Sequence, residues 1–202
     1  MLGLENKLAI VTGGASGIGR AIVMRLASSG ASVFSGDVDE KGNMETVDLA
    51  ADLTGGVKAA YLDIGDLNSI ENFKRTVFQY WENDPKKADI IVNAAGWDKI
   101  QSFLDSTPEF TDKVLNTNLK GPINVVRTFL PSMIEANEGK IINISSDAGR
   151  VGSMGETIYS GAKGGIIAFT KSLARETARN RINVNCVCPG PTNTPLLAAQ
   201  PE

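Results

Sequence analysis

The feature that most restricts the fold is a regular alternation between short apolar runs and longer amphipathic stretches. The apolar runs are rich in Val and Ile and cover residues 8–12, 32–37, 57–63, 90–93, 140–145 and 182–187. Helix-like stretches lie between them, at residues 18–29, about 39–53, 67–81, 108–135 and 158–179. Strands that are apolar at nearly every position are buried on both faces, as in parallel sheets. The pattern predicts an α/β fold of three layers, with six strands in a doubly wound parallel sheet.

Composition restricts the chemistry more than the fold. The chain has 202 residues, no histidine, two cysteines and a net charge of −3. This length predicts a single domain. The absence of histidine removes Ser-His and Cys-His nucleophile pairs and histidine metal sites, so proton transfer must use Tyr, Lys, Asp, Glu or a cofactor. A slightly acidic chain offers no basic face, so we expect no metal, no nucleic acid and no membrane partner.

The two cysteines and the chain ends say little about function. Cys186 and Cys188 lie at period two, which puts both thiols on one face of a strand. They could form a redox pair, but the usual burial of free cysteine favours two small core residues. The N-terminal sequence has no basic segment followed by a long apolar one, and no apolar run is long enough for a membrane span. We therefore expect a cytoplasmic protein.

A glycine-rich loop follows the first apolar run directly, with the sequence TGGASGIGR over Thr12–Arg20. Glycine tolerates positive φ and lets the backbone come close to a bulky anion. The N-terminus of the following helix offers free N–H groups and partial positive charge to a pyrophosphate. The glycine spacing is G-x-x-x-G-x-G and no P-loop lysine follows, so the loop predicts a dinucleotide site rather than a P-loop site.

Asp37 ends the second apolar run, where an acid suits the hydroxyls of an adenosine ribose and repels a 2′-phosphate. The alternative is a solvated aspartate in a turn, because Asp39 and Glu40 follow it. In the context of the glycine loop, Asp37 predicts a preference for NAD over NADP.

Tyr159 and Lys163 stand four residues apart in a helix-like stretch, which puts both on one helix face. A free tyrosine is a poor base at neutral pH, but a nearby ammonium group stabilises the phenolate and lowers its pKa. The pair can therefore move protons without histidine. Such pairs are also common on exposed helices, but here an apolar run ends at Ser145 and Ser146 just upstream, at the sheet end where ligands bind in this architecture.

In this order and spacing, the motifs resemble the short-chain dehydrogenase/reductase family over nearly the whole chain, from Thr12 to Thr194. Besides the glycine loop they are Asn93-Ala94-Ala95-Gly96, Asn118, the set Ser146, Tyr159 and Lys163, and Pro189-Gly190 followed by Thr194. The spacing between serine and tyrosine is the usual one of the family for Ser146 and not for Ser145. The resemblance implies a Rossmann-type fold and an NAD-dependent alcohol dehydrogenase or ketoreductase that acts on a small alcohol or ketone.

The resemblance also assigns roles to single residues. Tyr159 would be the general acid-base, Lys163 would lower the pKa of Tyr159 and bind the nicotinamide ribose, and Ser146 would hold the substrate oxygen. Asn118 would position a water that links Lys163 to solvent. Asp63 would contact the adenine and Thr194 the nicotinamide amide. The full set of cofactor residues that we expect is Gly13, Ser16, Gly17, Ile18, Gly19, Asp37, Asp63, Ile64, Asn93, Ala95, Gly96, Tyr159, Lys163, Pro189, Gly190, Thr192 and Thr194.

Two features depart from the family pattern. Ala94 replaces the second asparagine that usually follows the fourth strand, and we expect only a local loss of hydrogen bonding there. Family members usually continue past the position of Thr194 with a substrate-covering segment, another helix and a seventh strand. We therefore expect residues 1–202 to be a single NAD-binding Rossmann domain that lacks these elements. The family also implies a homotetramer or a homodimer.

The substrate is less well determined. Trp97 either lines the substrate pocket or packs in a loop. Of the charged residues Asp147, Arg150 and Glu156, we expect most to be solvated, although Arg150 could meet an anionic tail such as a coenzyme A phosphate. Three stretches, 96–98, 146–153 and 188–194, resemble 2-hydroxycyclohexanecarboxyl-CoA dehydrogenases, which implies a cyclic hydroxyacyl-CoA. The alternatives are a 3-oxoacyl-thioester reductase and a dinucleotide-binding protein without catalysis.

Overall fold

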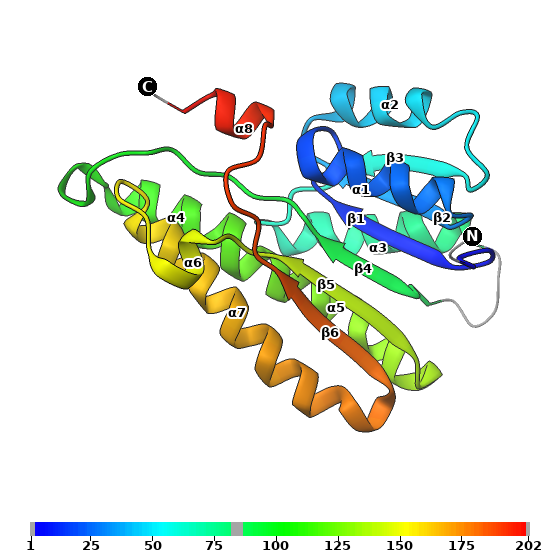
Figure 1. Ribbon diagram of the computed structural model, residues 1–202. Helices are drawn as coiled ribbons and strands as arrows, with labels where there is room; N and C mark the ends of the chain where they lie inside the picture. The colour runs from blue at the N-terminus through cyan, green and yellow to red at the C-terminus, as the bar shows by residue number, and fades with distance from the viewer. Residues whose placement is uncertain (1–2, 82–86, 201–202) are drawn as a thin grey trace.

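The computed structural model describes residues 3–81 and 87–200 and shows one six-stranded parallel sheet with helices on both faces (Figure 1). The ends of the expected domain, residues 1–2 and 201–202, lie outside the described residues. The strands are β1 (Leu8–Thr12), β2 (Ser32–Asp37), β3 (Val57–Tyr61), β4 (Ile90–Asn93), β5 (Gly139–Ile144) and β6 (Ile182–Val187). Their spatial order is β3-β2-β1-β4-β5-β6, with every neighbouring pair parallel. The predicted doubly wound fold is confirmed.

The long helices are α1 (Gly17–Ser28), α2 (Glu40–Leu49), α3 (Leu67–Tyr80), α4 (Pro108–Leu115), α5 (Gly121–Ala136) and α7 (Thr157–Thr177). Short elements are η1 (Phe103–Asp105), η2 (Asn116–Lys120), α6 (Ala148–Val151), η3 (Ala178–Asn180) and α8 (Pro195–Ala198). Local chemistry explains several boundaries. Thr107 caps α4 by accepting from the Phe110 N–H, and Pro108 occupies the first turn, where its missing N–H costs nothing. Gly30 follows α1 with a φ of 94°, the left-handed conformation of a helix C-terminus.

The prediction of one continuous helix over residues 108–135 is only partly right. The segment is helical throughout, but η2 is a turn of π-helix between α4 and α5. Pro122 stands at the start of α5 and cannot donate a backbone hydrogen bond, while the Gly121 N–H bonds to the Asn116 carbonyl five residues earlier. Single π-turns inside helices often mark functional positions, and this one carries Asn118.

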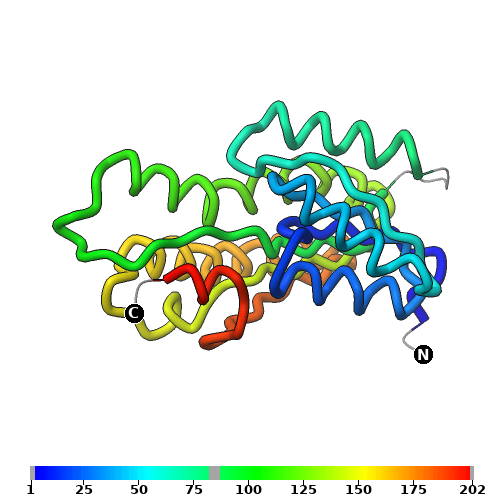
Figure 2. The backbone as a smooth tube through the Cα atoms, turned by 90° about the horizontal axis from the view of Figure 1, so that it is seen from above, coloured from blue at the N-terminus to red at the C-terminus, as the bar shows by residue number. Residues whose placement is uncertain are grey.

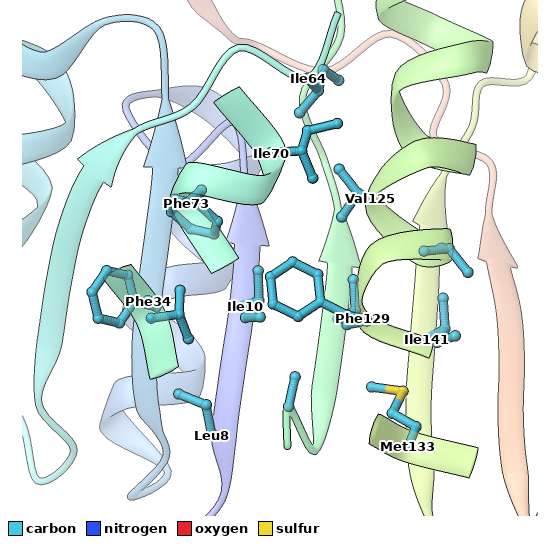
Figure 3. Close-up of a cluster of buried hydrophobic side chains, with 14 of the residues drawn as sticks. Leu8, Ile10, Phe34, Ile64, Ile70, Phe73, Val125, Phe129, Met133 and Ile141 are labelled. Atoms are coloured by element: carbon cyan, nitrogen blue, oxygen red, sulfur yellow. The ribbon is translucent and has the colours of Figure 1, made fainter. Parts of the chain in front are cut away.

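Two apolar clusters hold the helices to the sheet. On one face, α3 and α5 insert large side chains against β1, β2 and β5, including Phe73, Phe129 and Met133 (Figure 3). On the other face, Val23 and Ala27 of α1 pack against Val33 of β2 and its neighbours. Figure 2 shows α1 and α3 on opposite sides of the sheet. The buried strands therefore carry apolar residues on both faces, as their sequences predict.

The carboxyl ends of the strands all point to the same end of the sheet, and the loops that carry the predicted motifs meet there. Helix α8 lies above this end, beside the extended segment that follows β4 (Figure 2). The Gln200 side chain fixes the contact, because it donates to the Asp98 carbonyl and accepts from the Ile100 N–H at 3.2 and 2.9 Å. Among the described helices, none is long and apolar enough to cross a membrane.

Candidate active site

A cavity of about 1030 Å³ runs along the carboxyl ends of the strands, from Asp37 at the end of β2 to Tyr159 in α7. Its lining includes backbone of the glycine loop and side chains from the loops after β3, β4, β5 and β6. We call it the active-site cavity. The predicted residues that line it are Gly13, Ser16, Gly17, Ile18, Gly19, Asp37, Asp63, Ile64, Ala95, Gly96, Trp97, Ser146, Tyr159, Lys163, Pro189, Gly190, Thr192 and Thr194.

Three predicted site residues do not line the cavity. Asn93 is buried at the end of β4 and donates to the Asn143 side chain at 2.9 Å, so it ties two strands together. Arg150 is exposed and reaches back to the Asp147 carboxylate at 3.2 Å, as neighbours one helical turn apart do. The expectation that Arg150 could meet an anionic tail in the pocket therefore finds no support in its position. Asn118 lies behind the wall and is described below.

The glycine loop is held in place by close backbone packing. Gly13 has a φ of 76°, and a Cβ there would lie 2.6 Å from the Ala95 Cα, so only glycine lets the loop lie against the segment after β4. A Cβ on Gly19 would lie 1.9 Å from the Gly13 carbonyl oxygen. The loop then enters α1 with the free N–H groups of its first turn beside the cavity.

The end of the cavity near β2 is acidic. Asp37 accepts hydrogen bonds from the Ala15 and Asp39 N–H groups at 3.0 Å, which fixes its carboxylate against the glycine loop. Asp63 and Asp66 line the same region. Arg20 is turned away toward α2, where it donates to Thr46 and to the Gly42 carbonyl. This end of the cavity therefore presents carboxylate oxygens, which can accept hydrogen bonds from hydroxyl groups.

Tyr159, Ser146 and Lys163 meet at the other end of the cavity. The Lys163 ammonium lies 5.4 Å from the centre of the Tyr159 ring, and Ser146 is a hydrogen-bond partner of the Tyr159 hydroxyl. Ser145 is buried instead and donates to the Lys163 carbonyl at 2.8 Å. The structure therefore brings Ser146, and not Ser145, to the tyrosine, as the spacing predicts.

The pKa of Tyr159 differs from the expectation. It is raised to about 12, because the phenol is buried and because the Asp98 and Glu156 carboxyls lie nearby, while the bond with Ser146 acts the other way. Burial lowers the pKa of Lys163 to about 8, and the nearby Cys186 and Asp98 only partly oppose this. The lysine donates to the Ile144 carbonyl at 3.0 Å, which holds it at the end of β5. The predicted depression of the tyrosine pKa is therefore outweighed here by burial and two acids.

Asn118 in the π-turn connects the catalytic region to the loop after β4. Its side chain donates to the Trp97 carbonyl at 2.6 Å and to the Val114 carbonyl at 3.0 Å, and it accepts from the Trp97 N–H at 3.2 Å. A Cβ on Gly96 would lie 3.1 Å from the Asn118 oxygen and 3.5 Å from the Lys163 nitrogen. The asparagine thus lies close to Lys163 and fixes Trp97 in the cavity wall.

Several cavity residues were not predicted as site residues. Asp98 and Glu156 face each other in the wall near Tyr159, although Glu156 was expected to be solvated. Lys113 from α4 also reaches the cavity, and its ammonium lies 3.7 Å from the centre of the Trp97 ring. No local sequence pattern joins these residues, because they come from separate loops and helices. Trp97 both lines the cavity and packs on Phe110, so the two interpretations of this residue hold together.

The two cysteines are free thiols at the end of β6 and just beyond it, and both are partly buried. Burial and the neighbouring Cys188 thiol raise the pKa of Cys186. A raised pKa disfavours the reactive thiolate. Among the described residues, no group of three or more His, Cys, Asp or Glu side chains is placed to hold a metal ion.

Comparison with known proteins finds relatives that are similar over nearly the whole chain. A 3-oxoacyl-(acyl-carrier-protein) reductase from Thermotoga maritima is 37% identical over 98% of this chain and 79% of its own length. A subunit of a hydroxy(phenyl)methylsuccinyl-CoA dehydrogenase from Thauera aromatica is 35% identical over 100% of this chain and 79% of its own. A crystal structure of an actinorhodin polyketide ketoreductase with NADPH superposes with a TM-score of 0.92 at 32% identity, covering 98% of this chain and 76% of the other.

The family match extends over the residues that form both the sheet and the cavity. The sequence model of the short chain dehydrogenases matches residues 7–202, which include the glycine loop, all six strands and the Ser146–Lys163 region. The chain therefore belongs to the short chain dehydrogenase family, whose members are nicotinamide-dependent oxidoreductases of alcohols and ketones.

Proposed function

We propose that this protein transfers hydride between NAD and a secondary alcohol or ketone that is part of an acyl thioester. The observation that carries the proposal is the single cavity that joins Asp37 at one end to Ser146, Tyr159 and Lys163 at the other. A dinucleotide can span such a cavity with its adenosine at the acidic end and its nicotinamide at the tyrosine end.

The proton chemistry is assigned to Tyr159. In ketone reduction, the Tyr159 phenol gives its proton to the forming alkoxide and becomes a phenolate, and in alcohol oxidation the phenolate takes the hydroxyl proton as the carbon loses hydride. The nicotinamide ring supplies or accepts the hydride. Ser146 holds the substrate oxygen in line with the Tyr159 hydroxyl, its hydrogen-bond partner. Lys163 binds the ribose beside the nicotinamide and places a positive charge near the phenol when it is protonated.

Asn118 has a positioning role in this proposal. Its side-chain bonds to the Trp97 backbone and its closeness to Gly96 fix the wall on which the nicotinamide would lie. The proposed cofactor contacts are those predicted residues that line the cavity, with Gly13 to Gly19 at the pyrophosphate, Asp37 and Asp63 at the adenosine, and Pro189 to Thr194 at the nicotinamide. Asn93 supports them indirectly by joining β4 to β5.

The choice of NAD over NADP rests on charge. Among the described residues that line the cavity, the cationic side chains are Lys113 and Lys163, and both lie toward its catalytic end. The adenosine end carries Asp37, Asp63 and Asp66, and Arg20 is committed to α2. A 2′-phosphate placed there would meet carboxylates and no free cation, which costs binding energy. The NADPH in the polyketide ketoreductase structure is the ligand of that protein and does not identify the cofactor of this chain.

The thioester is proposed from the relatives and from the three stretches that resemble cyclic hydroxyacyl-CoA dehydrogenases. One relative is named as a reductase of an acyl-carrier-protein thioester and the other as a dehydrogenase of an acyl-CoA. The second candidate function is reduction of a 3-oxoacyl thioester. It differs from oxidation of a cyclic hydroxyacyl-CoA in the direction of hydride transfer and in the acyl group, and it uses the same chemistry. The presence of Ser146, Tyr159, Lys163 and Asn118 argues against a non-catalytic dinucleotide-binding protein. The homotetramer or homodimer and the cytoplasmic location stay predictions.

Initial rates test the proposal. The purified protein is assayed in both directions with NAD(H) and NADP(H) on a panel of cyclic and linear hydroxyacyl and oxoacyl thioesters and on simple cyclic alcohols. We expect thioesters to be turned over with NAD(H) at a kcat/KM at least tenfold above that with NADP(H). Faster turnover with NADP(H) contradicts the assignment of Asp37. Efficient oxidation of simple alcohols without turnover of thioesters contradicts the thioester proposal and leaves the hydride chemistry intact.

A further inference from the structure

Two carboxyl groups in the active-site cavity take no part in the chemistry proposed above. Asp98 lies in the loop after β4, and Glu156 directly precedes α7. Both side chains line the cavity, and both act on the pKa of Tyr159 through their charge. They therefore lie at the catalytic end of the cavity, where the part of a substrate next to its reacting carbon must be placed.

The two carboxyls share a hydrogen-bonding contact that needs a proton. Asp98 is only 7% exposed, and its Oδ2 atom is buried without a donor. The side chain that faces it is the Glu156 carboxyl, which has only acceptors when it is ionised. Burial and the hydrogen bond with Glu156 raise the pKa of Asp98 to about 7. One proton shared between the two oxygens satisfies both and leaves the pair with one negative charge.

The positive groups near the pair form no ion pair with it. Lys163 acts on Asp98 from α7, but its ammonium is bound to the Ile144 carbonyl, and the Lys99 backbone N–H is the other favourable group. The Tyr159 phenol is uncharged near neutral pH. Among the described residues, neither Asp98 nor Glu156 makes an ion pair. The catalytic end of the cavity therefore faces the substrate with a carboxylate that no ion pair neutralises, although Lys113 and Lys163 line the same end.

The position of the pair is fixed from two sides. Gln200 holds the loop backbone by its bonds to the Asp98 carbonyl and the Ile100 N–H. Glu156 is held at the start of α7, where its carbonyl accepts from the Ser160 N–H at 2.7 Å. Because both carboxyls are carried on backbone that is held in place, a substrate anion placed beside them would be repelled at close range in a site of low dielectric.

We propose that Asp98 and Glu156 are specificity-determining residues that reject substrates with a free carboxylate within one methylene of the reacting carbon and admit neutral ester or thioester analogues. The inference rests on the proposed function and deepens it, since it explains why a thioester, and not the corresponding free acid, is the substrate. The repulsion acts on binding and on the transition state alike, so it appears in both Kd and kcat/KM.

The test uses two ketones of the same carbon skeleton, acetoacetate and methyl acetoacetate, with NADH at pH 8. We expect the unmodified protein to prefer the neutral ester by roughly 30-fold or more in kcat/KM, because like charges at close range disfavour binding of the anion. In the Asp98→Asn, Glu156→Gln double variant this preference falls at least tenfold, through faster use of acetoacetate. Asp112→Asn, which removes an exposed carboxylate on α4, leaves the preference within twofold.

A binding measurement separates this inference from the proposed function. Trp97 lies in the cavity wall, so its fluorescence reports binding of either ketone without turnover. If neither ketone is reduced but the ratio of their Kd values changes at least tenfold in the double variant, the hydride-transfer proposal fails and the carboxyl pair stands. If the preference for the ester is absent from the unmodified protein, or changes less than twofold in the double variant, the carboxyl pair is not a specificity determinant.

Discussion

The two ends of the sheet differ in whether their charged and polar side chains have partners. At the amino end, Lys7 and Lys87 each bond to both Asp89 and Glu138 at 3.0–3.3 Å, and the Leu8 N–H also donates to Asp89. At the carboxyl end, the buried side-chain atoms without a hydrogen-bond partner among the described residues are Asn93 Oδ1, Asp98 Oδ2 and Ser160 Oγ. The charged side chains at the amino end are paired, whereas the carboxyl end leaves three buried polar atoms unpaired, one of them in Asp98, which lines the cavity.

This difference indicates that the amino end of the sheet contributes mainly to stability and the carboxyl end mainly to activity. An ionised group in a low-dielectric site is stabilised when it is paired and destabilises the fold when it is not. Polar groups that lack partners in the protein are available to a ligand, and strongly shifted pKa values are typical of functional sites. Changes at the carboxyl end should therefore alter activity more than stability, and changes at the amino end should do the reverse.

The largest effect should come from Tyr159→Phe, which removes the proposed acid-base oxygen and little else. We expect kcat to fall by about 10²–10⁴-fold, the usual contribution of general acid-base catalysis. The Kd of NADH should stay within twofold and the free energy of unfolding within about 1 kcal/mol. Steady-state rates, a fluorescence titration with NADH and urea unfolding measure the three quantities. A variant with unchanged kcat would refute the acid-base role.

At the amino end, Asp89→Ala should act on stability. The substitution leaves the Leu8 N–H without its acceptor and the largely buried Lys87 with only Glu138 as a partner. We expect the free energy of unfolding to fall by about 2–4 kcal/mol, as for other broken buried pairs. Urea unfolding should show a lower midpoint with an unchanged slope, while kcat at 25 °C stays within twofold. A large loss of kcat in the folded variant would contradict the division between the ends.

The pH dependence of stability should differ between unmodified protein and Asp98→Asn. The folded-state pKa of Asp98, about 7, is above its ordinary value of 3.8, so the folded state binds this proton more tightly than the unfolded chain. Between about pH 4 and 7 the unmodified protein therefore loses stability relative to the variant as the pH rises. We expect their difference in Tm to change by about 3 °C or more across this window. Parallel curves of Tm against pH would contradict the buried carboxyl pair.

The smallest effect on stability should come from Glu138→Gln. Its pH dependence should have the opposite sign to that described for Asp98. Its two lysine partners lower the pKa of Glu138 below its ordinary value of 4.5, with Lys87 contributing first. The stability that the carboxylate adds is present above pH 4.5 and is lost as the pH falls through the lower folded-state value. Because the side chain is half exposed, we expect less than about 1 kcal/mol at pH 7. Equal destabilisation at pH 3 and pH 7 would exclude the ion pairs as its cause.

Much of the fold could be predicted because the strands are buried on both faces. The runs at Leu8–Thr12 and Ile182–Val187 are strands with the predicted bounds. The pattern is less informative at the sheet edge and inside long helices. The third run ends as a strand at Tyr61, two residues early, and the π-turn before Pro122 keeps the apolar spacing of a helix. Local periodicity does not distinguish such a turn from ordinary helix.

The candidate site likewise contains residues that could be predicted from the sequence and residues that could not. Tyr159 and Lys163 could be predicted because their relation is local, one helical turn, and Asp37 because it ends a strand. The contact between Asp98 and Glu156 depends on the path of the loop after β4, which Gln200 fixes from a distant part of the chain. Arg150 is the opposite case, since its nearness to Ser146 in sequence does not bring its side chain into the cavity.

The strand order also has a consequence for how the chain is made. β1 lies in the interior of the sheet, so one edge of this strand pairs with β2 and the other with β4. Ala9, for example, is in register with Val33 on one side and with Ile90 on the other. During synthesis the first three strands emerge together, but the second edge of β1 stays open until β4 leaves the ribosome. An open apolar strand edge invites pairing with other chains. The nascent chain therefore carries an open strand edge until β4 is made, and the residues of the catalytic end, Ser146, Tyr159 and Lys163, are synthesised only after that edge can close.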